Sequence, residues 1–123
     1  MADVEVKDKT IIVHKVWCAV NCGTAINPHI VKAQMRSGIN FGLTAALHGK
    51  ITFKDGQIEQ GNFDSYPILM MSEAPEIEVT VVDSKDPPTG VGEPGTPPIA
   101  AAVGNAIFRA TGQRLRRLPF QVG

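Results

Sequence analysis

One carboxylate stands in an unusually stiff segment near the end of the sequence. Glu93 lies in the stretch Thr89-Gly90-Val91-Gly92-Glu93-Pro94-Gly95-Thr96-Pro97-Pro98, among three glycines and three prolines. Glycine lets the backbone approach a ligand closely, whereas proline fixes φ and removes a hydrogen-bond donor. The stretch therefore predicts a rigid loop that presents one ionisable side chain at the start of a helix. Such a position suits a general base, because proton transfer needs a carboxylate held in fixed geometry. The alternative role for Glu93 is a carboxylate that the positive end of the helix dipole favours.

A second candidate site lies on an earlier helix. Asn27-Pro28 is a typical helix start, with asparagine as the N-cap and proline at the first helical position. An apolar ridge for the core recurs every four residues, at Val31, Met35, Ile39, Leu43 and Leu47. A different row holds Gln34, Gly38 and Gly42. Glycine inside a helix costs roughly 1 kcal/mol relative to alanine, so another group is expected to come close to that face. It is either a second helix or strand, or a ligand that the Gln34 amide could hydrogen-bond.

The remaining pattern describes the elements that must position these residues. Strands are predicted at Val4 to Val6, Thr10 to Val20, Lys50 to Lys54, Gln57 to Gln60 and Glu76 to Asp83. Asp55-Gly56 is a two-residue hairpin signal. The last helix is expected to be capped by Thr96 and stopped by Gly112. The order β-β-α-β-β-β-α predicts one α+β domain over residues 1–123, with two helices packed against a mixed, largely antiparallel sheet.

Composition excludes several classes of function. Twelve basic and twelve acidic residues cancel, so nothing attracts the chain to nucleic acid or to an anionic membrane. No apolar run approaches the roughly 20 residues of a membrane span, and the first residues do not resemble a signal peptide. A cytoplasmic location is expected, or a periplasmic one if a partner carries the chain across. Cys18 and Cys22 are expected to be reduced thiols, and the histidines do not complete a zinc site.

Two longer stretches resemble a known family. Gly90-Val91-Gly92-Glu93-Pro94-Gly95, followed by Pro98-Ile99-Ala100-Ala101-Ala102-Val103-Gly104-Asn105-Ala106-Ile107, is similar to the carboxyl-terminal segment of molybdenum hydroxylases. These enzymes form the xanthine dehydrogenase and aldehyde oxidase family, and the residue pattern is most similar to that of large subunits of the isoquinoline 1-oxidoreductase type. Val16-Trp17-Cys18-Ala19-Val20-Asn21-Cys22-Gly23-Thr24-Ala25-Ile26-Asn27-Pro28 resembles the segment that precedes the family's cofactor-facing helix.

The resemblance implies a reaction and a set of roles. These enzymes hydroxylate a carbon next to nitrogen or an aldehyde carbon, with oxygen derived from water. Their cofactor is molybdenum held by molybdopterin, in bacteria usually as molybdopterin cytosine dinucleotide. Glu93 matches the general base and Gln34 the glutamine that hydrogen-bonds the pterin, while Gly38, Gly92 and Gly95 match close-approach positions. The implied partners are the remainder of the large subunit, an iron–sulfur subunit and a small-molecule substrate.

The sequence departs from the family pattern at several points. Asn21 stands where the family commonly has an acidic residue, and the residues between Met35 and Gly42 differ from the family's usual aromatic-Gln-Gly surroundings. Family large subunits are several times longer, so the isolated chain is expected to be inactive. The rival hypothesis is a degenerate, non-catalytic domain. Both hypotheses predict self-association through exposed apolar residues, namely Phe63, Tyr66, Ile68, Leu69, Met70 and Met71.

Overall fold

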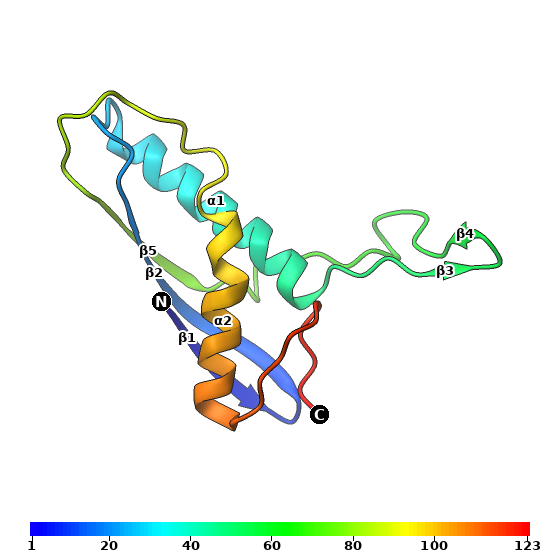
Figure 1. Cartoon of the computed structure of the whole chain (residues 1–123). Coiled ribbons are helices and arrows are strands. Elements are labelled where there is room, and N and C mark those ends of the chain that lie inside the picture. Colours follow the sequence, from blue (N-terminus) through cyan, green and yellow to red (C-terminus); the bar gives the residue numbers. More distant parts are fainter.

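The computed structural model describes residues 1–123 and has the predicted order of strands and helices. The elements are β1 (Ala2–Lys7), β2 (Thr10–Val20), α1 (Pro28–Leu47), β3 (Phe53–Lys54), β4 (Gln57–Ile58), β5 (Glu76–Val81) and α2 (Thr96–Thr111). Figure 1 shows α2 crossing α1 near the middle of the molecule, with the strands β1, β2 and β5 on one side of this crossing. The predicted α+β class is confirmed.

The main sheet is mixed and has the strand order β1-β2-β5. β1 and β2 pair antiparallel as a hairpin, whereas β2 and β5 pair parallel. The parallel pair is possible because α1 and a long excursion lie between β2 and β5 in the sequence. β3 and β4 form a separate antiparallel pair, so two of the three strand pairs are antiparallel, in agreement with the prediction.

An irregularity in β2 decides which of its side chains reach the core. Lys15 pairs with Asp3, but Val13 pairs with Val4, so His14 has no residue opposite it. Such a bulge reverses the alternation of side chains along the strand. Val13 and Val16 therefore both face inward, with 5% and 3% of their surface exposed.

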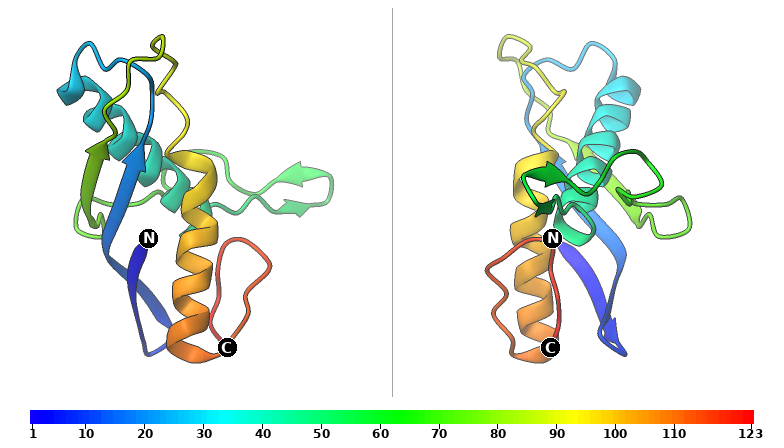
Figure 2. Two further views of the ribbon diagram at one scale, coloured as in Figure 1. Left: turned by 60° about the vertical axis from the view of Figure 1, so that its left-hand side comes forward. Right: turned by 90° about the vertical axis from the view of Figure 1, so that its right-hand side faces the viewer.

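The two helices cover one face of this sheet. α1 contacts β5, α2 contacts β1, and the helices contact each other. Figure 2 shows both helices lying against the strands from further sides. The core consists of apolar residues from β2, β5, α1 and α2, with Leu43, Val103 and Ile107 completely buried. The periodic ridge of α1 faces this core as predicted, although Leu47 is only half-buried.

The predicted helix ends are confirmed at two places. The Asn27 side chain accepts hydrogen bonds from the backbone N–H groups of His29 and Ile30, at 3.1 and 3.2 Å, and so caps α1. Gly112 follows α2 with a left-handed φ of 75°, a conformation that glycine adopts without strain. Neither helix combines the length and hydropathy that a membrane crossing requires.

Residues 50–71 form an arm that projects from the end of α1 (Figures 1 and 2). Asp55 and Gly56 turn its tip with φ angles of 49° and 78°, as the two-residue hairpin signal predicted. The strands that flank this turn are only two residues long, shorter than the predicted ones. The arm lacks a packed face of its own, and β3 and β4 are exposed along their whole length.

Candidate functional site

The candidate residues meet where the start of α2 crosses α1. A Cβ atom on Gly42 would lie 2.4 Å from Cγ2 of Ile99 and 2.7 Å from the backbone oxygen of Thr96. On Gly38 it would lie 3.3 Å from the Thr96 hydroxyl. The two glycines therefore let α2 approach the backbone of α1. Of the two explanations for the glycine row, packing against a second helix accounts for Gly42 and Gly38, and a cofactor contact of Gly38 stays a prediction.

The start of α2 is tied to α1 by a side chain that we expected to act as a cap. The N-cap position of α2 is Gly95, which makes no side-chain hydrogen bond, so the predicted capping role of Thr96 is wrong. The Thr96 hydroxyl instead donates a hydrogen bond of 3.0 Å to the backbone oxygen of Gly38. The reason is that Gly95 already has helical angles, φ −73° and ψ −25°, which leaves Thr96 inside the helix and beside α1.

Gly95 is the second point of close approach. It is buried, and a Cβ atom at this position would lie 2.8 Å from the backbone oxygen of Met35 and 3.1 Å from the backbone nitrogen of Ile39. Any other residue would push the loop away from α1. Gly92, three residues earlier, is exposed and has open space around its α-carbon. Packing against α1 thus explains why residue 95 is a glycine, whereas no contact within the chain requires glycine at position 92.

Glu93 is exposed and its carboxylate has no hydrogen bond or ion pair within the chain. Its backbone oxygen accepts a hydrogen bond of 2.8 Å from the Thr96 N–H, which holds the turn that leads into α2. The next two positions of the helix, Pro97 and Pro98, have no N–H to offer to a carboxylate. Glu93 therefore does not act as a helix cap, and its carboxylate is free to face a molecule outside the chain.

Gln34 lies one helical turn before Gly38 on the same row of α1 and is exposed. Its amide forms no hydrogen bond within the chain. Gln34 is next to the residues against which the loop packs, since Gly95 meets the backbone of Met35. The structure thus brings the α1 row and the loop of Glu93 to one crossing, with two unpartnered polar side chains at its border.

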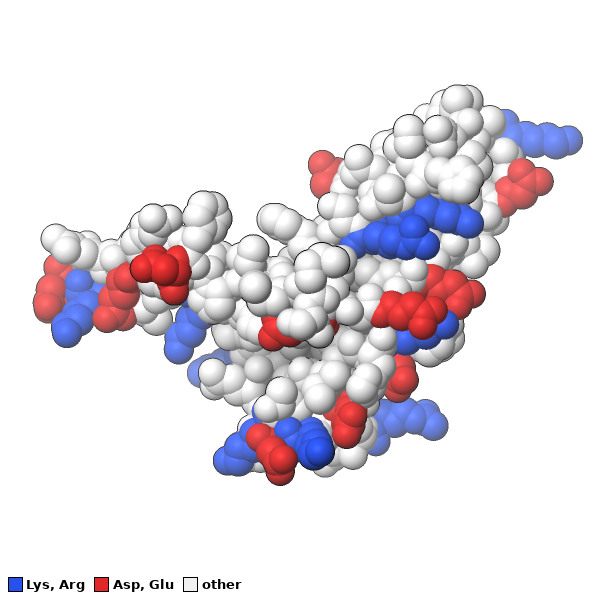
Figure 3. All heavy atoms as spheres, turned by 180° about the vertical axis from the view of Figure 1, so that it is seen from behind, with Lys and Arg blue, Asp and Glu red and all other residues white.

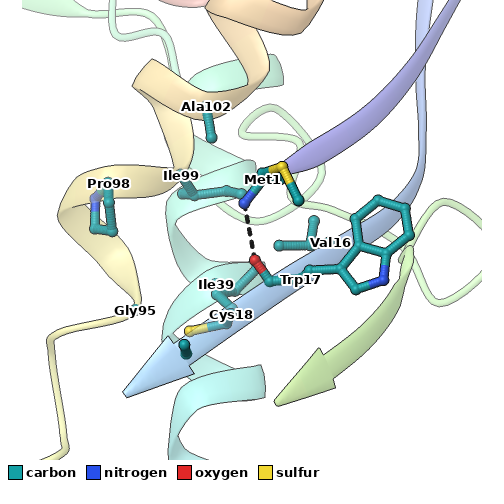
Figure 4. Close-up of a pocket in the computed structure, with 10 residues that line it drawn as sticks. Met1, Val16, Trp17, Cys18, Ile39, Gly95, Pro98, Ile99 and Ala102 are labelled. Atoms are coloured by element: carbon teal, nitrogen blue, oxygen red, sulfur yellow. Dashed lines mark hydrogen bonds between the residues drawn. The ribbon is translucent and has the colours of Figure 1, made fainter. Parts of the chain in front are cut away.

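A small cavity of about 210 Å³ lies on the inner side of this crossing (Figure 4). Its lining is mostly apolar and includes Trp17, Ile39, Pro98 and Ile99, but neither Glu93 nor Gln34. The amino group of Met1 closes one side by donating a 2.8 Å hydrogen bond to the backbone oxygen of Trp17. This cavity is therefore separate from the border that carries the two polar side chains.

Both cysteines are free thiols, as expected, and one of them lines the cavity. Burial raises the pKa of the Cys18 thiol. A raised pKa lowers the thiolate fraction near neutral pH, and the thiolate is the reactive form. Cys18 is accordingly a packing residue. The structure also has no group of three or more His, Cys, Asp or Glu side chains arranged to hold a metal ion.

A third row of α1 was not predicted from the sequence. The Arg36 side chain donates to the Ile77 backbone oxygen at 3.2 Å, and the Thr44 hydroxyl accepts from the Leu69 N–H at 3.2 Å. His48 lies 3.6 Å from the Glu73 carboxylate. With Asn40, these residues recur every fourth position, which is the signal that could have identified them. Arg36, Thr44 and His48 contact β5 and the chain that returns to it from the arm, away from the crossing, whereas the Asn40 side-chain oxygen has no hydrogen-bond partner in the chain.

Comparison with known proteins adds the family. Residues 1–75 match the model of the molybdopterin cofactor-binding domain, a range that contains Gln34 and Gly38 but not the loop of Glu93. The isoquinoline 1-oxidoreductase subunit beta of Brevundimonas diminuta is 43% identical over 114 residues, which is 93% of this chain and 15% of that protein. A membrane-bound aldehyde dehydrogenase of Gluconacetobacter polyoxogenes is 35% identical over 121 residues, or 97% of this chain and 16% of that protein.

Solved structures agree with the sequence relatives. The aldehyde oxidoreductase of Desulfovibrio desulfuricans superposes with a TM-score of 0.79 and 29% identity, over 94% of this chain and 13% of that one. Quinoline 2-oxidoreductase from Pseudomonas putida has a TM-score of 0.77 and 28% identity, over 84% of this chain and 14% of that one. The chain thus spans about 15% of the length of the curated relatives that it matches. Because the family model covers more than half of the sequence and the fold agrees, the chain belongs to the molybdopterin cofactor-binding domain family of the molybdenum hydroxylases.

Proposed function

We propose that the chain is the part of a molybdopterin-dependent hydroxylase or aldehyde dehydrogenase that carries the general base, and that this base is Glu93. The observation that carries the proposal is the free carboxylate on a loop whose backbone is held before Glu93, where the Thr89 N–H donates a 2.9 Å hydrogen bond to the Cys22 backbone oxygen, and after it, at Thr96. The Thr96 N–H binds the backbone oxygen of Glu93, and the Thr96 hydroxyl binds α1. A base in such a frame needs little reorganisation to reach the proton of the oxygen that attacks the substrate.

The residues at the crossing suit a pterin cofactor at its border. Gln34 offers an amide with both donor and acceptor atoms and no competing partner in the chain. Gly92 leaves room for a close approach, because its α-carbon faces open space. The space beside the α-carbons of Gly38 and Gly95 is already occupied by protein atoms, so these two residues would offer the cofactor backbone contacts only. When bound, the molybdenum cofactor would supply the oxygen-transfer and redox chemistry that no side chain of this domain can provide. We infer the cytosine dinucleotide form, the usual bacterial one.

The role of Glu93 in such a site is to hold and move one proton. The carboxylate would accept, at Oε1 or Oε2, the proton of the oxygen nucleophile that it activates, while the two-electron oxidation of the substrate carbon and the loss of its hydrogen would be left to the cofactor. Pro94, whose φ is fixed, and the buried Gly95 follow Glu93 directly and would keep the carboxylate aimed at one position.

The site would be completed by polypeptide outside this chain. The relatives that it matches are much longer, and Glu93 and Gln34 are exposed in this chain instead of lining a closed pocket. We therefore propose the rest of a large subunit and an iron–sulfur subunit as partners, an N-heterocycle or an aldehyde as the substrate, and no turnover by the chain alone. A cytoplasmic location is proposed with them.

The test is a Glu93→Gln exchange in the assembled enzyme. The chain is co-expressed with the part of the Brevundimonas diminuta subunit that lies outside the matched region and with its redox partner, and turnover is followed with isoquinoline. Loss of a general base lowers kcat by a factor of about 10² to 10⁴, while the molybdenum content should not change. Asp83→Asn is the matched control, because Asp83 is also an exposed carboxylate without a partner in the chain. Turnover by Glu93→Gln at the rate of the control would reject the assignment.

A further inference from the structure

The arm at residues 50–71 holds a large share of the exposed apolar side chains. Seven of the sixteen large apolar residues that are exposed in this protein lie in the arm. The most exposed are Phe53 at 71%, Phe63 at 85% and Met71 at 92%. Apolar surface that is gathered in one segment and left in water marks an interaction site more often than chance does. The outer end of the arm also carries charged side chains of both signs (Figure 3).

The arm keeps its shape without a core of its own. The Gln60 side chain forms two hydrogen bonds with Thr52: it accepts from the Thr52 N–H at 2.7 Å and donates to the Thr52 hydroxyl at 2.8 Å. The Thr52 hydroxyl donates to the Glu59 carboxylate at 2.6 Å, and the Glu59 N–H donates to the Thr52 backbone oxygen at 3.0 Å. These bonds fix the two sides of the arm at its middle. A segment that is ordered before it binds loses less conformational entropy on binding.

The base of the arm is anchored to α1. The Leu69 N–H donates to the Thr44 hydroxyl, and Leu69 itself packs against the core. The Met70 N–H donates to the Glu73 carboxylate at 2.8 Å, which in turn faces His48. Two buried polar atoms beside this anchor, Asn40 Oδ1 and His48 Nε2, have no hydrogen-bond partner within the chain. A fixed base and a preformed outer part make the arm a rigid projection.

We propose that the arm docks into the remaining polypeptide of a molybdenum-hydroxylase large subunit, with Phe53 and Phe63 as its apolar anchors. The occupant follows from the proportions of the relatives. They match 93% and 97% of this chain, arm included, yet only 15% and 16% of their own length. In those proteins the equivalent of the arm has most of a large subunit outside this domain to bury it. This inference rests on the proposed function, because it takes its partner from the same enzyme.

The experiment measures binding separately from catalysis. The tagged full chain is co-expressed with the part of the Brevundimonas diminuta subunit outside the matched region, and the complex is isolated and its Kd determined. The variant Phe53→Asp/Phe63→Asp should raise the Kd roughly 30-fold or more, the range expected when two aromatic anchors are lost. Since both rings are exposed, the variant should unfold at the same urea concentration as the wild-type chain.

The control variant is Ile26→Asp, which changes an apolar residue that is 82% exposed but lies outside the arm. It should leave the Kd within about threefold of wild type. Equal loss of binding by Ile26→Asp, or unchanged binding by the arm variant, would overturn the proposal. A third outcome would also overturn it: the chain alone forms dimers, the arm variant disrupts these dimers, and the same variant still binds the large-subunit portion. The occupant of the arm would then be a second copy of the chain.

The two proposals fail in different ways. Glu93→Gln should bind the large-subunit portion as tightly as wild type, since Glu93 lies in the loop before α2 and is not one of the apolar anchors of the arm. If that variant kept full turnover, the base assignment would fall and the arm proposal would stand. If the arm variant kept full binding, the arm proposal would fall with no effect on the role of Glu93.

Discussion

Replacement of Gly42 by alanine should separate the two helices that carry the candidate site. The added methyl group would lie 2.4 Å from Cγ2 of Ile99 and 2.7 Å from the backbone oxygen of Thr96. Non-bonded carbon atoms pack favourably at about 3.5–4.0 Å. A rotation of Ile99 could relieve the first contact at a buried position, but the second contact is to backbone. The start of α2 must therefore move by roughly an ångström, and Glu93 is three residues away from Thr96.

The size of the effect follows from two opposing contributions. Overpacking of a well-packed contact costs about 1–3 kcal/mol, and the upper part of this range applies because a backbone atom is involved. Alanine returns about 1 kcal/mol through its higher helix propensity. The free energy of unfolding should therefore fall by about 1–2 kcal/mol. Urea unfolding of the full chain, followed by circular dichroism, would show this as a midpoint lowered by roughly 0.5–1 M.

Gly38→Ala is the matched control, one turn earlier in the same helix. At this position the nearest atom is the Thr96 hydroxyl at 3.3 Å, and the nearest backbone atom is 3.5 Å away. A side-chain oxygen can yield by a few tenths of an ångström, so the propensity gain should roughly cancel the cost. The reasoning is refuted if Gly42→Ala is as stable as wild type, or if the two variants have the same midpoint.

Two further predictions concern residues around the same crossing. Thr96→Val should lower the free energy of unfolding by about 1 kcal/mol because it removes the hydrogen bond to the Gly38 oxygen, and Thr96→Ser should restore most of it; equal midpoints for the two variants in urea would exclude this role. For Cys18, burial raises the pKa of the thiol in the folded state. The folded state therefore favours the neutral thiol, and the stability that this adds is present below the pKa of an unfolded cysteine. It is lost as pH rises through the higher pKa of the folded state. Alkylation of Cys18 by iodoacetamide, located by mass spectrometry, should accordingly reach half-maximal rate at a higher pH in the native chain than in urea, and a lower midpoint would contradict burial as the dominant influence on this thiol.

The order and type of the elements could be predicted because they depend on short-range chemistry. Asn27 and Pro28 start α1 through contacts within a few residues, and Asp55-Gly56 turns back because both residues tolerate a positive φ. The periodic ridge of α1 identified the face that meets the core. The shift in register at His14 was not predictable, because β2 is apolar at most of its positions and has no strict alternation that a bulge could interrupt.

For the candidate site, the sequence by itself determined a stiff loop around Glu93 and a row of small residues after Gln34. The resemblance to a family added the roles. Only the tertiary structure decided that Gly42 and Gly95 make room for protein, that Thr96 binds α1 instead of capping α2, and that the Glu93 carboxylate has no partner in the chain. The physical reason is that spacing along a helix specifies which residues share a face. Which element packs there depends on contacts between residues that are far apart in the sequence, such as Gly38 and Thr96.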